Sequence, residues 1–284
     1  MSIVVTGATG HLGRHVVEQL LEKVPADQIT AVARTADKVA DFAARGVKIA
    51  LADYNAPDSF DGLFAAGDKV LLISGNEIAK GRVQQHKVVI EAAKAAGVAL
   101  LAYTSGPAGL TAAIADDHRG TEEALLASGV PYALLRNGWY HENYTENLAP
   151  VLQHNAVVAA AGDGRVPGAS RADYAAAAAA VLTGEGHENQ TYELGGDVAW
   201  SFEEYAAELS RQTGKEIAYS PVSVEALTEI LVGSGLPEPL AAIFAGVDAS
   251  IAKGELVVTT GDLSRLIGRP TTPLSEAIAV ALKG

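Results

Sequence analysis

The sequence predicts an α/β fold, in which a doubly wound parallel sheet is joined to a smaller mixed α/β carboxyl-terminal lobe. Short apolar runs alternate with helical patterns over the first half of the chain. These runs are apolar throughout rather than on alternate residues, which is typical of parallel strands covered on both faces. After Arg136, glycine and proline become frequent and the expected strands are shorter. We therefore expect a sheet domain over residues 1–136 and a smaller lobe over 137–284. This division allows a segment of the second part to return to the sheet of the first.

The expected elements follow from these patterns in chain order. Apolar runs predict the strands of the first part, at 3–6, 28–33, 47–51, 69–73, 98–103 and 132–135. Apolar residues three or four apart predict its helices, at 12–21, 36–44, 57–66, 82–96 and 116–127. In the lobe, the same criteria predict strands at 157–160, 190–194 and 217–219 and helices at 172–182, 202–213, 224–233 and 237–246. Alternation of strands and helices predicts a sheet with helices on both faces.

The composition narrows the classes of function. A formal net charge of −13 argues against nucleic acid or an anionic membrane surface as a partner. There is no cysteine, which excludes disulfides, thiolate nucleophiles and cysteine metal sites. No apolar stretch reaches the length of a membrane span, and the first residues lack the basic segment of a secretory signal. We therefore expect a cytoplasmic protein.

The first strand is followed by a glycine-rich turn, GATGHLG, in which Gly7, Gly10 and Gly13 lie three residues apart. In dinucleotide-binding turns the first glycine permits a sharp turn and the second lets backbone N–H groups approach a pyrophosphate. The third lets the following helix pack closely on the strand. The helix N-terminus favours an anion, because its N–H groups are unpaired and its dipole is positive there. The pattern predicts a dinucleotide site; the alternative is a tight turn that binds no ligand.

Polar residues at the ends of the next strands point to the same cofactor. Arg34 ends the expected second strand, where an acidic residue would select NAD. A guanidinium can bind a phosphate through two hydrogen bonds, so we predict NADP; the alternative is a solvated surface arginine. Asp53 follows the third strand and fits a contact to adenine, and Ser74, Gly75 and Asn76 follow the fourth. Each of these also fits an ordinary loop.

The helix before the sixth strand lacks a familiar catalytic pair. In short-chain dehydrogenases a Tyr-x-x-x-Lys pair on this helix transfers a proton, and the matching positions here are His118 and Glu122. A carboxylate beside a histidine raises the pKa of the imidazole, the reverse of what lysine does to tyrosine. We therefore do not expect alcohol dehydrogenation or sugar epimerisation by that route. His118 is either a proton donor or a surface histidine.

A dense cluster, RNGWYHENY, follows the sixth strand at residues 136–144. Asn137 can hydrogen-bond a carboxamide, and Gly138 permits a close approach. Trp139 and Tyr140 offer flat surfaces to a planar ligand. The alternative is an aromatic anchor that packs the lobe onto the sheet domain.

A second cluster, GDGRVPGASRADY, covers residues 162–174. It places Arg171 and Asp173 at the start of a helix. Asp173 is typical of a capping or first-turn acid. Arg171 either reaches the cofactor or pairs with an acid.

Together these motifs resemble the NmrA-like branch of the atypical short-chain dehydrogenases/reductases. The similarity is greatest to bacterial NAD(P)H:quinone oxidoreductases, with triphenylmethane dye reductases as relatives. It runs from the first strand to the LIGRPTTPLSEAI segment at 266–278. This family also lacks the Tyr/Lys pair. The segment 106–115 departs from the family pattern near the expected substrate mouth.

The resemblance implies a Rossmann domain with a small carboxyl lobe, and NADPH as cofactor. It also implies that Asn137 and Tyr140 position the nicotinamide or the substrate. The cofactor contacts that it implies, together with the loop residues considered above, are Gly7, Ala8, Thr9, Gly10, His11, Leu12, Arg34, Asp53, Ser74, Gly75, Asn76, Asn137, Gly138, Trp139, Tyr140, Glu142 and Arg171.

A quinone suits such a site, because it takes a hydride directly and its anionic product can be protonated by water. The protein then supplies stacking, from Trp139, Tyr140 and Tyr144, and orientation, from Asn137. We therefore expect an NADPH-dependent quinone reductase that uses neither flavin nor metal. The alternative is an NmrA-like regulator that senses the nucleotide and turns nothing over. The oligomeric state does not follow from the sequence.

Overall fold

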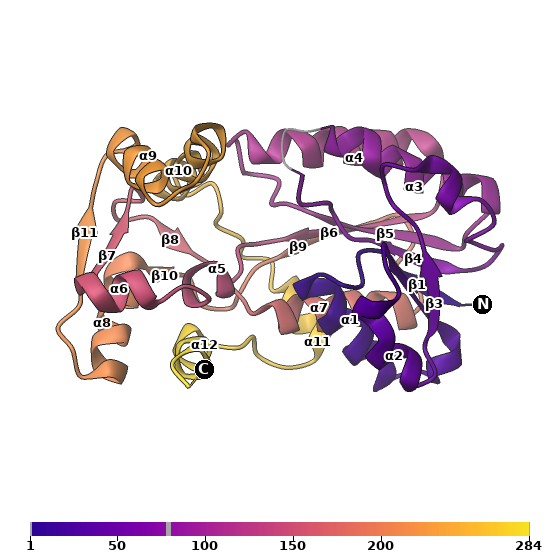
Figure 1. The fold of residues 1–284 in the computed structure, drawn as a ribbon, viewed down its shortest axis with the longest axis horizontal. Coiled ribbons are helices and arrows are strands. Elements are labelled where there is room, and N and C mark those ends of the chain that lie inside the picture. The colour runs from indigo at the N-terminus through magenta and orange to yellow at the C-terminus, as the bar shows by residue number, and fades with distance from the viewer. Residues whose placement is uncertain (1, 78–80, 284) are drawn as a thin grey trace.

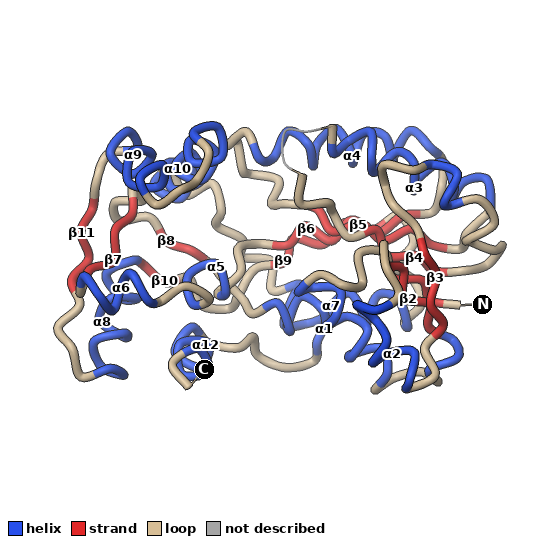
Figure 2. The backbone as a smooth tube through the Cα atoms, in the orientation of Figure 1, coloured by secondary structure: helices blue, strands red, loops and turns tan. Residues whose placement is uncertain are grey.

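The computed structural model describes residues 2–77 and 81–283, and its larger part is built around a seven-stranded parallel sheet (Figures 1 and 2). The strands lie in the order β3-β2-β1-β4-β5-β6-β9. Their bounds are Ile3–Val5 (β1), Ile29–Ala33 (β2), Lys48–Leu51 (β3), Lys69–Leu72 (β4), Leu100–Ser105 (β5), Tyr132–Asn137 (β6) and Gln190–Leu194 (β9). The direction of winding reverses between β1 and β4, so the loops that leave these strands diverge and open a crevice at the carboxyl edge.

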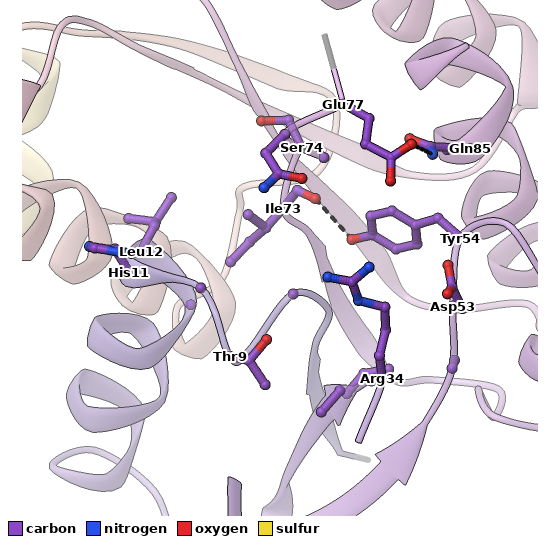
Figure 3. Close-up of a pocket in the computed structure, with 18 of the residues that line it drawn as sticks. Thr9, His11, Leu12, Arg34, Asp53, Tyr54, Ile73, Ser74, Glu77 and Gln85 are labelled. Carbon is purple, nitrogen blue, oxygen red and sulfur yellow. Dashed lines mark hydrogen bonds between the residues drawn. The ribbon is translucent and has the colours of Figure 1, made fainter. Parts of the chain in front are cut away.

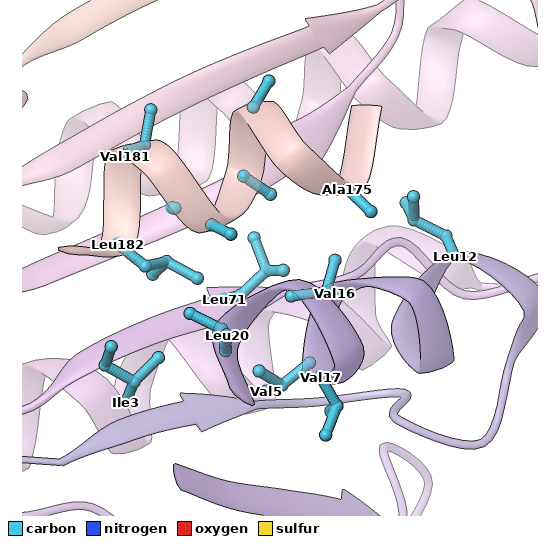
Figure 4. Packing of buried hydrophobic residues seen from close by; sticks show 14 of the residues in the cluster. Ile3, Val5, Leu12, Val16, Val17, Leu20, Leu71, Ala175, Val181 and Leu182 are labelled. Atoms are coloured by element: carbon cyan, nitrogen blue, oxygen red, sulfur yellow. The ribbon is translucent and has the colours of Figure 1, made fainter. Parts of the chain in front are cut away.

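Helices cover both faces of this sheet, as the sequence predicts (Figure 1). On one face lie α1 (His11–Leu21), α2 (Ala40–Ala44), α7 (Arg171–Thr183) and α11 (Asp262–Ile267). On the other lie α3 (Arg82–Ala96) and α4 (Ile114–Ser128). The alanine-rich α7 packs against α1 over the sheet, because its small side chains let the two helices approach closely (Figure 4). Residues beyond 136 therefore contribute both α7 and β9 to the sheet domain.

The lobe has two short sheets, in which β7 (Ala156–Ala159) pairs with β11 (Ala218–Pro221) and β8 (Arg165–Val166) pairs with β10 (Trp200–Ser201). Its helices are α5 (Glu142–Thr145), α6 (Ala149–His154), α8 (Phe202–Thr213), α9 (Val224–Gly233), α10 (Glu238–Ala252) and α12 (Leu274–Ala281). An aromatic core that includes Trp200, Phe202 and Tyr205 holds these elements together. Within the described ranges, no helix has both the length and the apolar character that crossing a bilayer requires.

The helix expected at 57–66 is wrong. A single 3₁₀ turn at Pro57–Phe60 is followed by turns, and Gly62 adopts a left-handed φ of +69° that interrupts a helix. Phe60 and Phe64 are both buried in the core beneath α3, so their apolar spacing reflects burial rather than helix formation. The helix expected at 36–44 is divided into a 3₁₀ turn at Asp37–Val39 and the short α2.

Candidate functional site

A cavity of about 390 Å³ opens at the crevice between β1 and β4 (Figure 3). Loops after β1, β2, β3 and β4 form most of its wall, and Gln85 of the helix at 82–96 and two residues from beyond β6 complete it. The lining residues that the sequence analysis nominated are Gly7, Thr9, Gly10, His11, Leu12, Arg34, Asp53, Ser74, Gly75, Asn76, Tyr140 and Arg171. Segments that are far apart in the chain are thus brought to one cavity at the carboxyl edge of the sheet.

The glycine turn has the geometry that an anion site requires. Gly7 has a φ of +62°, and the Gly10 N–H donates to the Gly7 carbonyl oxygen at 3.0 Å. A Cβ on Gly13 would stand 2.2 Å from that same oxygen, so only glycine lets α1 lie this close to the turn. The first turn of α1 has no side-chain cap and no acidic residue, which leaves its N-terminus suited to an anion. Ala8 is fully buried and does not line the cavity.

Arg34 extends from the end of β2 into the cavity and is exposed (Figure 3). The acidic residues that follow it in the sequence have other contacts: Asp37 accepts a hydrogen bond from Thr35, and Asp41 pairs with Arg14. The Arg34 guanidinium is therefore positioned to bind an anion in the cavity. Asp53 lies on the next loop, where its carboxylate also accepts from the Asn55 N–H at 2.9 Å and so shapes its own turn.

Several lining residues were not found from the sequence, namely Val32, Ala33, Ala52, Tyr54, Asn55, Ile73, Glu77 and Gln85. The Tyr54 hydroxyl donates to the Ile73 carbonyl oxygen at 2.9 Å and thereby joins two walls of the cavity (Figure 3). Gln85 donates to Asn55 at 2.9 Å and to Glu77 at 3.1 Å. Tyr54 directly follows Asp53 in the sequence, and this position was the one signal from which a missed lining residue could have been found.

Tyr140 and Arg171, which come from beyond β6, also line the cavity. The Tyr140 ring packs edge-on against Tyr174 with centroids 5.2 Å apart, and the Arg171 guanidinium lies 5.3 Å above it. Burial raises the pKa of the Tyr140 hydroxyl, which is therefore protonated at neutral pH. Arg171 also pairs with Glu146, whose carboxylate lies 3.1 Å from His11 Nδ1. The pairing of Arg171 with an acid is therefore confirmed, whereas its contact with the cofactor stays a prediction that its place in the cavity wall supports.

The neighbours of Tyr140 do not line the cavity. Asn137 is buried and its Nδ2 donates to the Tyr140 hydroxyl at 3.3 Å, while its Oδ1 has no hydrogen-bond partner. A Cβ on Gly138 would stand 2.8 Å from the Leu194 carbonyl oxygen, so this glycine permits a close approach of the protein's own backbone.

Three other residues of the RNGWYHENY cluster serve packing and capping. Trp139 and Tyr144 pack on the core of the lobe, which fits the anchor alternative. Glu142 accepts two hydrogen bonds from the Arg171 N–H, at 2.9 and 3.1 Å, at the start of α7. Asp173 forms a capping box with Ser170 there, which confirms it as a capping acid.

The expectation that Glu122 raises the pKa of His118 is wrong. Burial and then the charge of Arg82 lower that pKa to about 3, so the imidazole is neutral at physiological pH. The Glu122 carboxylate is held by the Arg136 guanidinium at 2.7 Å and by the Ser105 hydroxyl at 2.5 Å. His118 Nδ1 lies 2.9 Å from the Tyr103 hydroxyl, and His118 does not line the cavity.

The chain is similar in sequence and in fold to proteins that are already known. The sequence profile of the NAD(P)H-binding family matches residues 7–185. Quinone oxidoreductase 2 of Escherichia coli (strain K12) is 45% identical over 283 residues, which cover 98% of this chain and 97% of that protein. A solved structure of the NADPH-dependent quinone oxidoreductase QOR2 from E. coli, complexed with NADPH, superposes with a TM-score of 0.95 at 44% identity, covering 99% of each chain. Triphenylmethane reductase of Citrobacter sp. superposes with a TM-score of 0.93 at 42% identity, covering all of both chains.

Proposed function

Because this chain belongs to the NAD(P)H-binding family, we propose that it is an NADPH-dependent quinone oxidoreductase. It reduces a quinone, or a similar planar electron acceptor, by direct hydride transfer. The observation that carries this conclusion is the full-length match to the NADPH complex of the E. coli enzyme, at a TM-score of 0.95. The cavity supports it independently, because an uncapped helix N-terminus and an exposed arginine lie in its wall.

The described residues fit NADPH. The N–H groups of His11 and Leu12 at the start of α1 would hold the pyrophosphate, and Arg34 would hold the 2′-phosphate. The loops that carry Asp53 and Ser74 would border the rest of the cofactor. Asn137 does not line the cavity, and we assign it to holding Tyr140, because its Nδ2 donates to the Tyr140 hydroxyl at 3.3 Å.

The chain's own residues supply orientation rather than acid catalysis. When bound, NADPH supplies the hydride that reduces the acceptor. Tyr140 presents an aromatic ring that Asn137 and Tyr174 hold in place, and a planar acceptor can stack on such a ring. The product anion of a quinone is delocalised and takes its proton from water, so a neutral His118 is compatible with turnover.

The test is NADPH oxidation by the purified protein, with and without a small benzoquinone or naphthoquinone, followed by the absorbance of reduced nicotinamide. We expect quinone-dependent oxidation that yields hydroquinone in equal amount. Tight binding of NADPH without oxidation by any quinone would instead indicate the nucleotide-sensing regulator. The same assay with a triphenylmethane or azo dye defines the range of acceptors. A cytoplasmic location stays a prediction.

A further inference from the structure

The loop that leaves β4, residues 73–75, lines the cavity and is held by side chains from several other elements. The Ile73 N–H donates to Thr6 Oγ1 at 3.2 Å. The Ser74 N–H donates to Thr104 Oγ1 at 2.9 Å. The Gly75 N–H donates to His86 Nε2 at 2.9 Å. Because the backbone of this loop is anchored by side chains, its position depends on residues outside the cavity.

His86 lies on α3, is fully buried and does not line the cavity. Since the Gly75 N–H must donate, Nε2 carries no proton, and the imidazole proton is on Nδ1. Nδ1 then donates to Thr121 Oγ1 at 2.9 Å, and the Thr121 hydroxyl donates to the Asp117 carbonyl oxygen at 2.7 Å. This chain of donors and acceptors determines both the tautomer and the charge state of His86.

Arg82, one helical turn before His86, contacts the carbonyl group of the same residue, Gly75. Its side chain is buried, and its Nη1 donates to the Gly75 carbonyl oxygen at 3.3 Å. Its Nε lies 3.2 Å from the Asp117 carboxylate, which balances the buried charge. A Cβ on Gly75 would stand 3.3 Å from Gln85 Oε1, so the loop is packed tightly on α3. Two adjacent turns of α3 therefore bind both the N–H and the C=O of Gly75.

We propose that His86 is a positioning residue for NADPH, because it fixes Gly75 and with it the cavity wall beside the cofactor. The inference rests on the proposed function, since it takes the cavity to be the NADPH site. An apolar side chain could fill the space of His86 and preserve the core. It could not accept the Gly75 N–H, and a buried donor without a partner is costly. The loop would then move to regain a partner, and the wall of the cavity would move with it.

The experiment compares His86→Leu with His86→Gln. Glutamine can place its side-chain oxygen near the position of Nε2 and accept the same N–H, whereas leucine cannot. For each variant we would measure the Kd of NADPH by calorimetry, the kcat and KM for a benzoquinone, and the melting temperature. His187→Leu is the control, because His187 is a partly buried histidine that contacts Tyr192 outside the cavity.

We expect His86→Leu to raise the Kd of NADPH about tenfold and to lower kcat, and His86→Gln to stay within about threefold of the wild type. The control should leave both quantities unchanged. If His86→Leu does not fold, Thr121→Val carries the test, because it frees the imidazole to take the Nε2–H tautomer that cannot accept from Gly75. We expect that variant to raise the Kd about threefold.

The proposal would be overturned if His86→Leu lowers the melting temperature but keeps the wild-type Kd and kcat. The same result in Thr121→Val would overturn it if that variant is the one used. His86 would then be a purely structural residue. Equal losses in His86→Gln and His86→Leu would overturn it as well. A wild-type protein that neither binds NADPH nor reduces a quinone would instead refute the proposed function. The two failures are therefore distinguishable.

Discussion

Replacing Arg34 by alanine should remove most of the preference for NADPH over NADH. Arg34 is exposed at the end of β2 and lines the cavity. Its guanidinium can form charge-assisted hydrogen bonds to a 2′-phosphate, which NADH lacks. Such bonds contribute about 1.5–3 kcal/mol when they form. Because Arg34 is solvated, we take about 2 kcal/mol, which corresponds to a roughly 30-fold rise in the Kd of NADPH.

The assay is a titration of each cofactor by calorimetry, with kcat/KM for a quinone measured in parallel. The affinity for NADH should change less than about twofold, because no contact to NADH is lost. Arg45→Ala is the matched control: it removes one positive charge from an arginine that pairs with Glu18 and does not line the cavity. It therefore measures the general electrostatic effect of a lost cation on a chain of net charge −13. Equal losses for NADPH and NADH in Arg34→Ala, or an unchanged Kd for NADPH, would refute the assignment of Arg34 to the 2′-phosphate.

Three further changes test the site and its support. Tyr140→Ala should lower kcat for a quinone about tenfold while the Kd of NADPH changes less than about threefold, because stacking of the acceptor is lost; equal losses in both would contradict a stacking role. Gly13→Ala should lower the free energy of unfolding, measured in urea, by about 3 kcal/mol, because its Cβ would stand 2.2 Å from the Gly7 carbonyl oxygen. In Gly10→Ala the Cβ would stand 3.4 Å from the same oxygen, so the loss should be under about 1 kcal/mol. Burial lowers the pKa of both His86 and His118 to about 3, so the unfolded chain binds two more protons below about pH 6.5, and stability falls as the pH drops from about 6.5 toward 3. Each histidine contributes about 3 kcal/mol to this fall by pH 4, and His86→Leu should reduce the fall accordingly.

For the last prediction, the measurement is urea unfolding of both proteins at pH 7 and at pH 4. An identical fall in wild type and His86→Leu would show that other groups account for the acid sensitivity. For Gly13→Ala, an unfolding free energy close to that of Gly10→Ala would contradict the prediction, because it would show that the turn can move to accept the Cβ without loss of stability.

Local patterns were sufficient for the parts of the molecule that depend on local physics. The glycine turn was predictable because the sterics of a sharp turn, and of a helix against a strand, act within a few residues. The doubly wound sheet followed from apolar runs and helical spacing. The position of Arg34 followed from its place at the end of a strand, since parallel strands end at the same edge of the sheet.

Features that depend on contacts between distant segments became known only from the tertiary structure. Trp139 and Tyr140 are adjacent in the sequence and have similar character, yet one packs on the lobe core and the other lines the cavity. The pKa of His118 could not be inferred from its neighbour Glu122, because Arg136 on the next strand holds that carboxylate. The hydrogen bonds of residues 73–75 come from partners that are up to 67 residues away in the sequence. The sequence by itself therefore determined the fold class, the turn and the cofactor type, which rest on local sterics and strand order. Only the tertiary structure decided which side chains line the cavity together, which form ion pairs and which form hydrogen bonds. These contacts depend on distances between residues that are far apart in the sequence and come together on folding.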